Sequence, residues 1–269
     1  MKLAASTVLF LLLVCLSAST IRAQNDKTPA PKPGDEEKAA QILQRATESL
    51  GGSAYLNVRT VTARGLYTQF EAGQPAIPLS FIDYIVYPDK ERTEFKGDGV
   101  KSIQTNTGDT GWLFDGVAKS IKPMKAKQIA DFKFALRTNV DTLLRGTWRA
   151  EGAKIAYAGR REAGVGKRNE AVRVTYPDGF AVEFEFGQQD HLPAKVVYTK
   201  KNPENELEEI KEEDRMQRYL EFNGILAPYV VDHYRAGIQI SRINYDTIEY
   251  NAVLADSLFV QPATAKDIK

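Results

Sequence analysis

The sequence predicts an α+β domain in which short antiparallel strands dominate and two helical segments accompany them. Between residues 57 and 250, most apolar side chains recur with a period of two, in short runs separated by Gly, Pro, Asn and Asp. Apolar residues recur every three or four positions near residues 36–50 and 124–144. The 12 Tyr, 12 Phe and 2 Trp lie mostly in the strand-like runs, which favours a β-rich fold.

The first 23 residues have the layout of a secretory signal peptide. Lys2 gives a positive start, the run from Leu3 to Leu16 is largely apolar, and Ile21-Arg22-Ala23 offers a cleavage site. This run is too short for a comfortable membrane span. We therefore expect cleavage after Ala23 and a periplasmic location.

The single cysteine, Cys15, lies inside this predicted signal. Lipid attachment requires a small residue directly before the cysteine, whereas Val14 stands here. An ordinary signal-peptide residue is the favoured interpretation, and lipidation at Cys15 stays the alternative. The mature chain would have no disulfide, so its core must hold the domain together, which suits a bacterial periplasm.

Beyond the signal, the composition predicts one domain. Residues 24–35 form a flexible, proline-containing linker, residues 36–263 a single globular domain and residues 264–269 a tail. About 245 residues remain after cleavage, a common size for one β-rich domain. Without Lys2 and Arg22, 34 basic residues face 35 acidic ones, so no basic excess is available to bind nucleic acid.

An amphipathic helix opens the domain. Asp35 is expected to cap it and Gly51-Gly52 to end it. One face of this helix is apolar and should pack on something larger; it carries Ala39, Ile42, Leu43, Ala46 and Leu50.

An antiparallel meander follows, with one helical interruption. The segment from Met124 to Leu144 predicts one or two helices with a break near Thr138-Asn139. The charged stretch from Pro203 to Glu213 is expected to form an exposed hairpin. Strands are expected at residues 57–70, 79–87, 91–95, 100–105, 111–115, 118–121, 154–159, 170–176, 180–186, 194–200, 216–222, 226–234 and 238–250.

Motifs for catalysis, metals and cofactors are missing from the sequence. His191 and His233 have no second ligand at metal-binding spacing. No Gly-x-Ser-x-Gly or Ser-x-x-Lys motif and no phosphate-binding loop is present. Glu183 and Glu185 share one strand face, for which a solvated face is the favoured interpretation, although paired carboxylates leave a hydrolase as the least favoured alternative.

Many large apolar side chains lie on strands that too few helices can cover. Most of them belong to an ordinary core under the simpler interpretation. The alternative is a cavity for an apolar ligand between a curved sheet and the helices. The candidate lining residues are Trp112, Phe114, Val172, Val174, Phe180, Val182, Phe184 and Tyr198.

The order of these features resembles the LolA-like superfamily of periplasmic lipoprotein carriers and outer-membrane lipoprotein-sorting homologues. The resemblance covers residues 36–263 and rests on order rather than on one specific motif. Its parts are Leu50-Gly51-Gly52, Tyr87-Pro88 with Arg92, the hairpin from Thr107 to Gly116 around Trp112, the helical insert, and an ending similar to the family's closing strands at Asn223–Pro228, Asn251–Asp256 and Leu258–Pro262.

The resemblance implies an incomplete, strongly curved antiparallel β-barrel whose open side is covered by a helical lid. The apolar residues Ile129, Phe132 and Leu136 would face inward from that lid. The implied function is a monomeric, non-enzymatic binder of an acyl chain, phospholipid or lipoprotein, with no cofactor and with envelope proteins as further partners. Such a binder would carry its ligand toward the outer membrane.

One position departs from the family pattern. The carriers have a lid-latching arginine directly before the proline of the early turn, whereas Tyr87 stands here. The latch is therefore absent or built differently. An interaction or regulatory module on the same fold is the alternative function, with exposed residues around Glu206–Glu213 as its contact surface.

Overall fold

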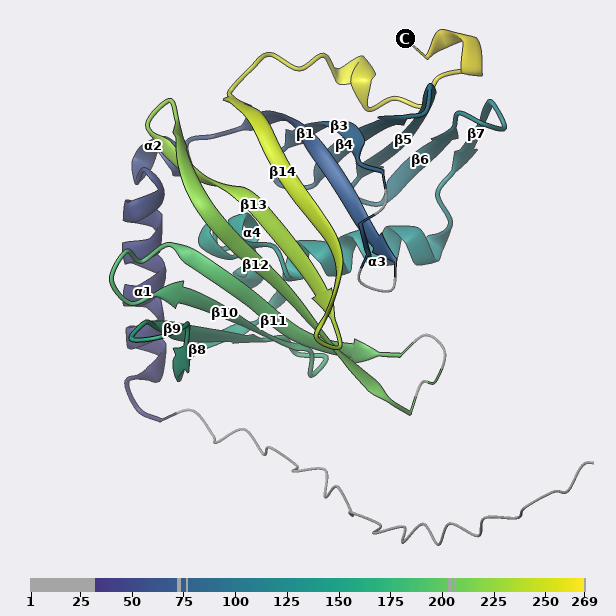
Figure 1. Ribbon diagram of the computed structural model, residues 1–269. Helices are drawn as coiled ribbons and strands as arrows, with labels where there is room; N and C mark the ends of the chain where they lie inside the picture. Colours follow the sequence, from purple (N-terminus) through teal and green to yellow (C-terminus); the bar gives the residue numbers. More distant parts are fainter. Residues whose placement is uncertain (1–31, 72–73, 76, 203–204, 206, 269) are drawn as a thin grey trace, which may run out of the picture. The chain divides into compact units, whose positions relative to one another are not determined.

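The computed structural model describes residues 32–268, except residues 72–73, 76, 203–204 and 206 (Figure 1). The predicted signal peptide, Cys15 and most of the predicted linker lie outside the described residues. Within the described part of the chain, every helix is too short or too polar to cross a membrane.

One antiparallel sheet forms the body of the structure. Its strands are β1 (Thr60–Glu71), β2 (Gln74–Pro75), β3 (Leu79–Val86), β4 (Lys90–Gly97), β5 (Val100–Thr107), β6 (Thr110–Asp115), β7 (Ser120–Pro123), β8 (Lys154–Glu162), β9 (Arg168–Thr175), β10 (Ala181–Gly187), β11 (Pro193–Lys201), β12 (Glu209–Phe222), β13 (Ile225–Arg235) and β14 (Ile238–Tyr250). The helices are α1 (Asp35–Leu50), α2 (Ser53–Leu56), α3 (Ala126–Arg137), α4 (Val140–Leu144) and the 3-10 helices η1 (Thr147–Glu151), η2 (Asp256–Leu258) and η3 (Ala265–Asp267).

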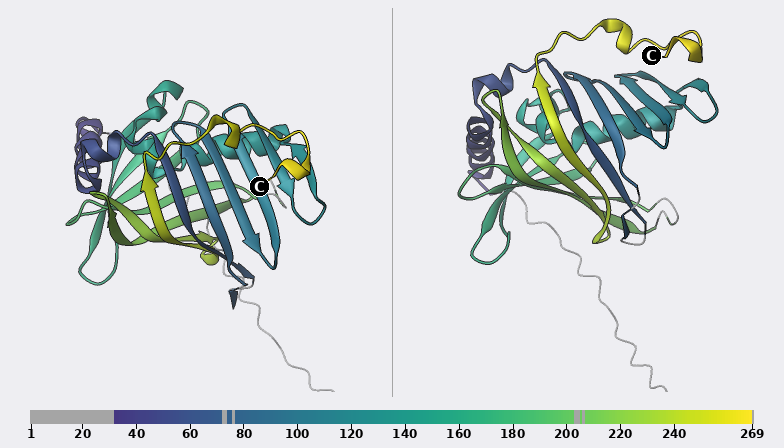
Figure 2. Two further views of the ribbon diagram at one scale, coloured as in Figure 1. Left: turned by 90° about the horizontal axis from the view of Figure 1, so that it is seen from above. Right: turned by 45° about the horizontal axis from the view of Figure 1, so that its top comes forward.

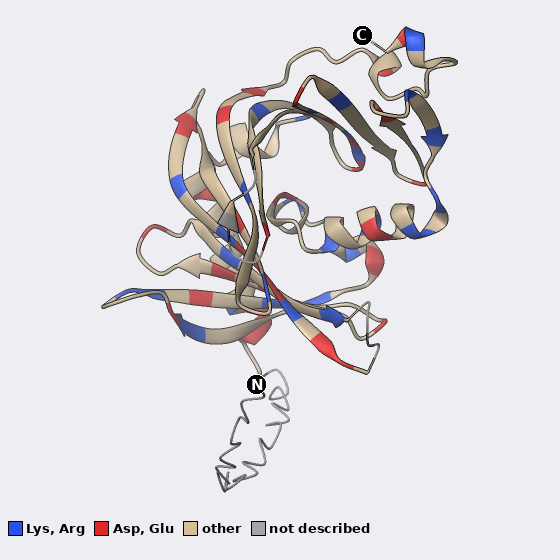
Figure 3. Cartoon of the chain, turned by 45° about the vertical axis from the view of Figure 1, so that its right-hand side comes forward, with Lys and Arg blue, Asp and Glu red and all other residues tan. Residues whose placement is uncertain are grey.

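The strand order places the helical insert across the open side of the sheet. The order is β7-β6-β5-β4-β3-β1-β14-β13-β12-β11-β10-β9-β8, with β2 attached to β1. The chain therefore leaves the centre at β1, reaches one edge at β7, crosses through α3, α4 and η1 to the other edge at β8, and returns to β14 beside β1. The sheet curves without closing into a barrel, and the insert lies between its two arms (Figures 2 and 3). This confirms the predicted incomplete, curved barrel.

The opening helix confirms its predicted apolar face. The residues buried on α1 are Ala39, Ile42, Leu43, Ala46 and Leu50, as the 3.6-residue period requires. Gly51 follows with a φ of 129°, a backbone conformation that side-chain-bearing residues avoid. The predicted cap is one residue off, because Asp35 is already the first helical residue and Gly34 precedes it.

Helix α1 and the second half of the insert, α4 and η1, cover one arm of the sheet. The apolar face of α1 packs with Leu143 of α4, with Trp148 of η1 and with inward side chains of β8–β11. Several of these strand residues, among them Val172, Val182 and Phe184, are at most 1% exposed. We call this cluster the packed arm.

The predicted closing strands after residue 250 are wrong. Residues 251–262 contain no strand, and the chain instead crosses β4 and β6. Trp112 Nε1 donates to the Phe259 carbonyl at 3.0 Å, and Arg92 Nη1 donates to the Leu258 carbonyl at 2.7 Å. The physical reason is that β14 already pairs with β1 on one side and β13 on the other, so no edge is free there for another strand.

Candidate ligand cavity

A cavity of about 360 Å³ lies between the centre of the sheet and α4, a volume within the range of small-molecule sites. Its walls come from β1, β3 and β11–β14, with α4 and the end of α1 at the rim. Half of the described lining residues are aliphatic: Leu50, Val58, Val61, Ala63, Ile85, Val140, Val196, Met216, Leu226, Ala227, Val231, Ile243 and Ile248. Such walls suit an apolar chain.

Five tyrosines among the described residues interrupt this apolar lining: Tyr55, Tyr87, Tyr219, Tyr245 and Tyr250. Burial raises the pKa of all five phenols above the ordinary value, so they are neutral hydrogen-bonding groups at physiological pH. The Tyr219 hydroxyl donates to the Pro193 carbonyl at 2.7 Å. The cavity is thus amphipathic rather than purely apolar.

Two of these tyrosines attach α4 to the rest of the domain. The Tyr87 hydroxyl donates to Asp141 Oδ2 at 2.9 Å, and the Tyr55 hydroxyl donates to Asp141 Oδ1. Because Tyr55 belongs to α2 and Tyr87 follows β3, one carboxylate on α4 joins three elements. After burial, the negative charge of Asp141 is the next cause of the raised pKa of both phenols.

Arg145, one turn after Asp141, adds a second attachment. Its Nη1 donates to the Leu56 and Val58 carbonyls at 3.1 Å each, and its Nη2 donates to the Tyr55 carbonyl at 3.0 Å. Its guanidinium lies 3.9 Å from the centre of the Tyr87 ring, a cation–π distance. We call Asp141, Arg145, Tyr55 and Tyr87 the latch. Tyr87, directly before Pro88, is therefore part of a cluster that attaches α4 to α2 and to the end of β3.

An N-terminal cap fixes where helix α4 begins. Asn139 caps it, since its side-chain oxygen accepts from the Asp141 and Thr142 backbone N–H groups at 2.7 and 3.2 Å. Asp141 and Arg145 are four residues apart and therefore share one side of the turn. The predicted break at Thr138-Asn139 is confirmed between α3 and α4.

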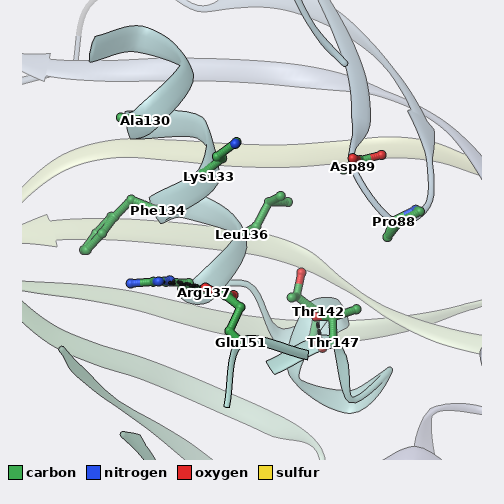
Figure 4. A pocket seen from close by; sticks show the side chains of 10 residues that line it. All are labelled: Pro88, Asp89, Ala130, Lys133, Phe134, Leu136, Arg137, Thr142, Thr147 and Glu151. Atoms are coloured by element: carbon green, nitrogen blue, oxygen red, sulfur yellow. Dashed lines mark hydrogen bonds and ion pairs between the residues drawn. The ribbon is translucent and has the colours of Figure 1, made fainter. Parts of the chain in front are cut away.

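A second hollow, of about 550 Å³, lies on the other side of the insert (Figure 4). Pro88 and Asp89 of the β3–β4 turn form one wall, and residues of α3, α4 and η1 form the other. Leu136 of α3 points toward the turn, whereas Phe134 points away from it (Figure 4). Because Asp141 lines the first cavity and Thr142 the second, α4 forms the partition between them.

A pair of carboxyls lies at the β3 side of the cavity. Asp83 lines it, and Thr93 Oγ1 lies 2.9 Å from Asp83 Oδ1 and 3.3 Å from Glu91 Oε1. One hydroxyl proton serves only one of the two carboxyls at a time. Burial raises the pKa of both, and the charge of Glu91 raises that of Asp83 further.

At another wall Asp214 is held by a histidine. His233 Nδ1 lies 2.5 Å from Asp214 Oδ1, and Nε2 lies 2.9 Å from Glu212 Oε2. Burial lowers the pKa of His233, but its bond to Asp214 and the charges of Asp214 and Glu212 outweigh this and raise it above the ordinary value. The acidic neighbours therefore favour the protonated form of this ring.

The structure places the eight predicted lining residues elsewhere. Val172, Val174, Val182 and Phe184 lie in the packed arm, buried against α1, and Phe180 and Tyr198 lie at its edge. The Phe180 and Tyr198 rings meet Phe134 of α3, with centroids 4.6 and 5.7 Å apart. On the other arm, Trp112 is covered by the C-terminal segment, and Phe114 lines a separate hollow beside Gly99 and Lys266. Ligand contact by these residues stays a prediction.

The predicted lid residues lie on α3 and differ in their surroundings. Phe132 is buried, Ile129 is partly buried, and Leu136 lines the second hollow. Their role as a lid stays a prediction at this point.

Three expectations about acidic residues are wrong. Glu185 does not lie on a solvated face: it is 2% exposed and bonds Asn169 and Lys195 at 2.9 and 3.1 Å. Glu212 and Glu213 are buried on β12, where they pair with Lys200 and Lys211, so they are not part of an exposed surface. Basic side chains make this burial possible: Lys195 and Lys200 lie on a neighbouring strand, and Lys211 lies on β12 itself.

Sequence reasoning missed the tyrosines and the latch. Tyr245, Ile248 and Tyr250 recur along the last strand on the cavity side, which is a detectable signal. Asp141 carries no such signal, because its partners are 54 and 86 residues away in the chain. Among the described residues, no group of three or more His, Cys, Asp or Glu side chains is arranged to hold a metal ion.

Known proteins share this fold at low sequence identity. No protein-family model and no curated protein sequence matches the chain. A DUF1329 family protein from Desulfovibrio piger is 12% identical, with a TM-score of 0.58, and the match covers 84% of this chain and 97% of that one. A LolA superfamily protein from Nitrosomonas europaea is 11% identical, with a TM-score of 0.56, over 83% and 97% of the two chains.

A third structure, a candidate outer membrane lipoprotein-sorting protein domain from Vibrio parahaemolyticus, is 12% identical, with a TM-score of 0.54 over 82% and 97% of the two chains. These matches confirm the resemblance to the LolA-like superfamily at the level of the fold.

Proposed function

We propose that this protein is a non-enzymatic binder in the bacterial envelope that holds an apolar chain in the cavity between the sheet and α4. The observation that carries the proposal is a cavity with aliphatic walls, beneath a helical insert, on a LolA-like fold. Burial of each methylene against such walls contributes about 0.8 kcal/mol to binding. The N-terminal signal-like sequence supports export to the periplasm.

The helices α3 and α4 serve as the lid. They belong to the segment that connects the two edges of the sheet, and they lie on its concave side (Figure 3). Because α4 separates the cavity from the second hollow, a shift of α4 would join the two spaces and admit a longer chain. The latch holds α4 in the closed position, and a ligand or partner must offset its hydrogen bonds to open it.

Filling the cavity with a larger side chain tests this function. Ala227 lines the cavity and is 7% exposed, so Ala227→Trp fills space that a ligand would occupy. We expect this variant to remain folded by circular dichroism and to lose binding of an uncharged apolar dye. Ala163→Trp, on an exposed turn, is the matched control and should bind the dye as the wild type does.

A folded Ala227→Trp protein that binds the dye with unchanged stoichiometry would exclude the cavity as the site. Native mass spectrometry of the protein purified from the periplasm supplies a second readout. A co-purifying lipid or acylated peptide supports the carrier function. An empty protein that also refuses lipid in titration favours an interaction module instead.

A further inference from the structure

Acidic side chains outnumber basic ones around the cavity, and the basic one is already engaged in hydrogen bonds. Three carboxyls line it, from Asp83, Asp141 and Asp214, whereas Arg145 is the one basic residue among the described lining residues. Arg145 has both terminal nitrogens on backbone carbonyls, which leaves its buried Nε–H as the donor without a partner. Fixed positive charge facing a ligand is therefore scarce.

The three cavity carboxyls also differ in their hydrogen-bond and ion-pair partners. Asp141 accepts two phenol hydroxyls, and Asp214 is paired with His233. Asp83 shares the Thr93 hydroxyl with the carboxyl of Glu91 on the adjacent strand. Among the described residues, Asp83 is thus the cavity carboxyl with neither a basic side chain nor two hydroxyl donors bonded to it, and a cation placed beside it would favour its ionised form.

Tyr245 lies close to this carboxyl, on the other side of β1. Gly65 stands between β3 and β14 in the pairing register, and with no side chain there the Phe81 and Tyr245 rings meet edge to face at 5.7 Å. Asp83 pairs with Ala63, the next inward position along β1. After burial, the charges of Asp83, Asp141 and Glu91 raise the pKa of the Tyr245 phenol, as expected for a phenol close to these carboxyls.

We propose that the cavity takes an amphiphile with a cationic head: an alkylammonium group beside Asp83 and the Tyr245 ring, with its alkyl chain along the aliphatic wall. A carboxylate and an aromatic face are the two groups that proteins use to hold ammonium cations. This inference rests on the proposed function and names its ligand class.

Three probes with the same twelve-carbon tail test the head group. Dodecyltrimethylammonium, laurate and dodecyl maltoside each displace an uncharged cavity dye from the full-length mature chain, below their aggregation concentrations. The quaternary ammonium keeps its charge at every pH, so its binding does not depend on protonation of the probe itself. We expect half-displacement by the ammonium probe at about tenfold lower concentration than by laurate, a difference of about 1.4 kcal/mol.

Two isosteric variants locate the effect. Asp83→Asn should remove most of the preference for the ammonium probe and leave dodecyl maltoside unchanged. Asp98→Asn, in the exposed β4–β5 turn, is the control and should keep the preference.

The wild-type ranking is decisive even if Asp83→Asn does not fold. Displacement by laurate at equal or lower concentration than by the ammonium probe overturns the cationic head and points to the free Nε–H of Arg145. If the dye itself does not bind, and none of the three probes binds by calorimetry, the proposed function fails as well. The two failures are therefore distinguishable.

Discussion

The two parts of the concave face use the same kind of strand for opposite purposes. In the packed arm, β8–β11 point branched and aromatic side chains at α1, and those side chains are nearly unexposed. At the centre, β1 and β13 carry smaller residues such as Ala63 and Ala227, and the helices that border the cavity are the end of α1, the short α2 and the short α4. A cavity thus remains where α1 ends, and Leu50 is the one residue of that helix that lines it.

The largest expected effect belongs to the packed arm. Phe184→Ala removes a 1% exposed ring between Val172 and Val196, and should lower the free energy of unfolding by about 3–5 kcal/mol. Ile248→Ala, at the cavity wall, should cost about 1 kcal/mol, because that side chain already borders empty space. Urea unfolding measures both, and equal losses would contradict the contrast between the two regions.

The latch should give the next largest effect. Asp141→Ala leaves two buried phenol hydroxyls without their acceptor, which should cost about 1–3 kcal/mol. Stopped-flow measurement should also show faster release of a cavity dye, because α4 loses its attachment to Tyr55 and Tyr87. Unchanged release from a folded variant would show that α4 is not the gate.

The buried carboxyls predict a pH dependence. Folding raises the pKa of Asp83, so above the unfolded-state pKa the native state binds the extra proton and stability falls as pH rises toward the folded-state pKa. Asp83→Asn has no proton to bind, so its stability relative to the wild type should grow with pH. Glu91, Thr93 and Tyr245 face the same group and remain in the variant. A stability difference between variant and wild type that stays constant from pH 4 to pH 8 would show that the pKa of Asp83 is not raised by folding, as expected for a solvent-exposed carboxyl.

The smallest effect is expected on the outer side of the lid. Asp131 pairs with Lys127 at 2.8 Å, four residues apart on α3, and both side chains are mostly exposed. Asp131→Ala should change the free energy of unfolding by about 0.3–0.5 kcal/mol and leave dye release unaltered. A large effect on release would show that α3, rather than the latch on α4, controls access.

The contrast between the packed arm and the cavity also shows which features could be predicted from the sequence. Local periodicity predicted α1 with its five buried residues and the break at Thr138-Asn139, because each depends on neighbours in the chain. The same periodicity recognised Val182 and Phe184 as inward-facing without showing that α1 covers them. Whether an inward-facing strand surface is covered or borders a cavity depends on where a distant helix ends. That depends on the tertiary structure and cannot be read from local periodicity.

The latch shows the same limit at single residues. An aspartate on a short helix has the composition of an ordinary surface position, and its buried role appears only once Tyr55 and Tyr87 are brought to it. Likewise, Glu185 and Glu212 looked like solvent-facing strand residues until adjacent strands supplied Lys195 and Lys200.

The pairing of β1 with β14 sets the order in which the domain assembles. Val61 pairs with Tyr250, so the central seam joins the two ends of the strand region. Every other neighbouring pair along the sheet joins strands that follow one another in the chain, with the short β2 alone standing between β1 and β3. Contacts that close so long a loop form slowly. We expect two meanders to collapse first and the seam to close last. Until it closes, β1 and β14 are two long unpaired edges, so the newly exported chain is most exposed to aggregation in that interval.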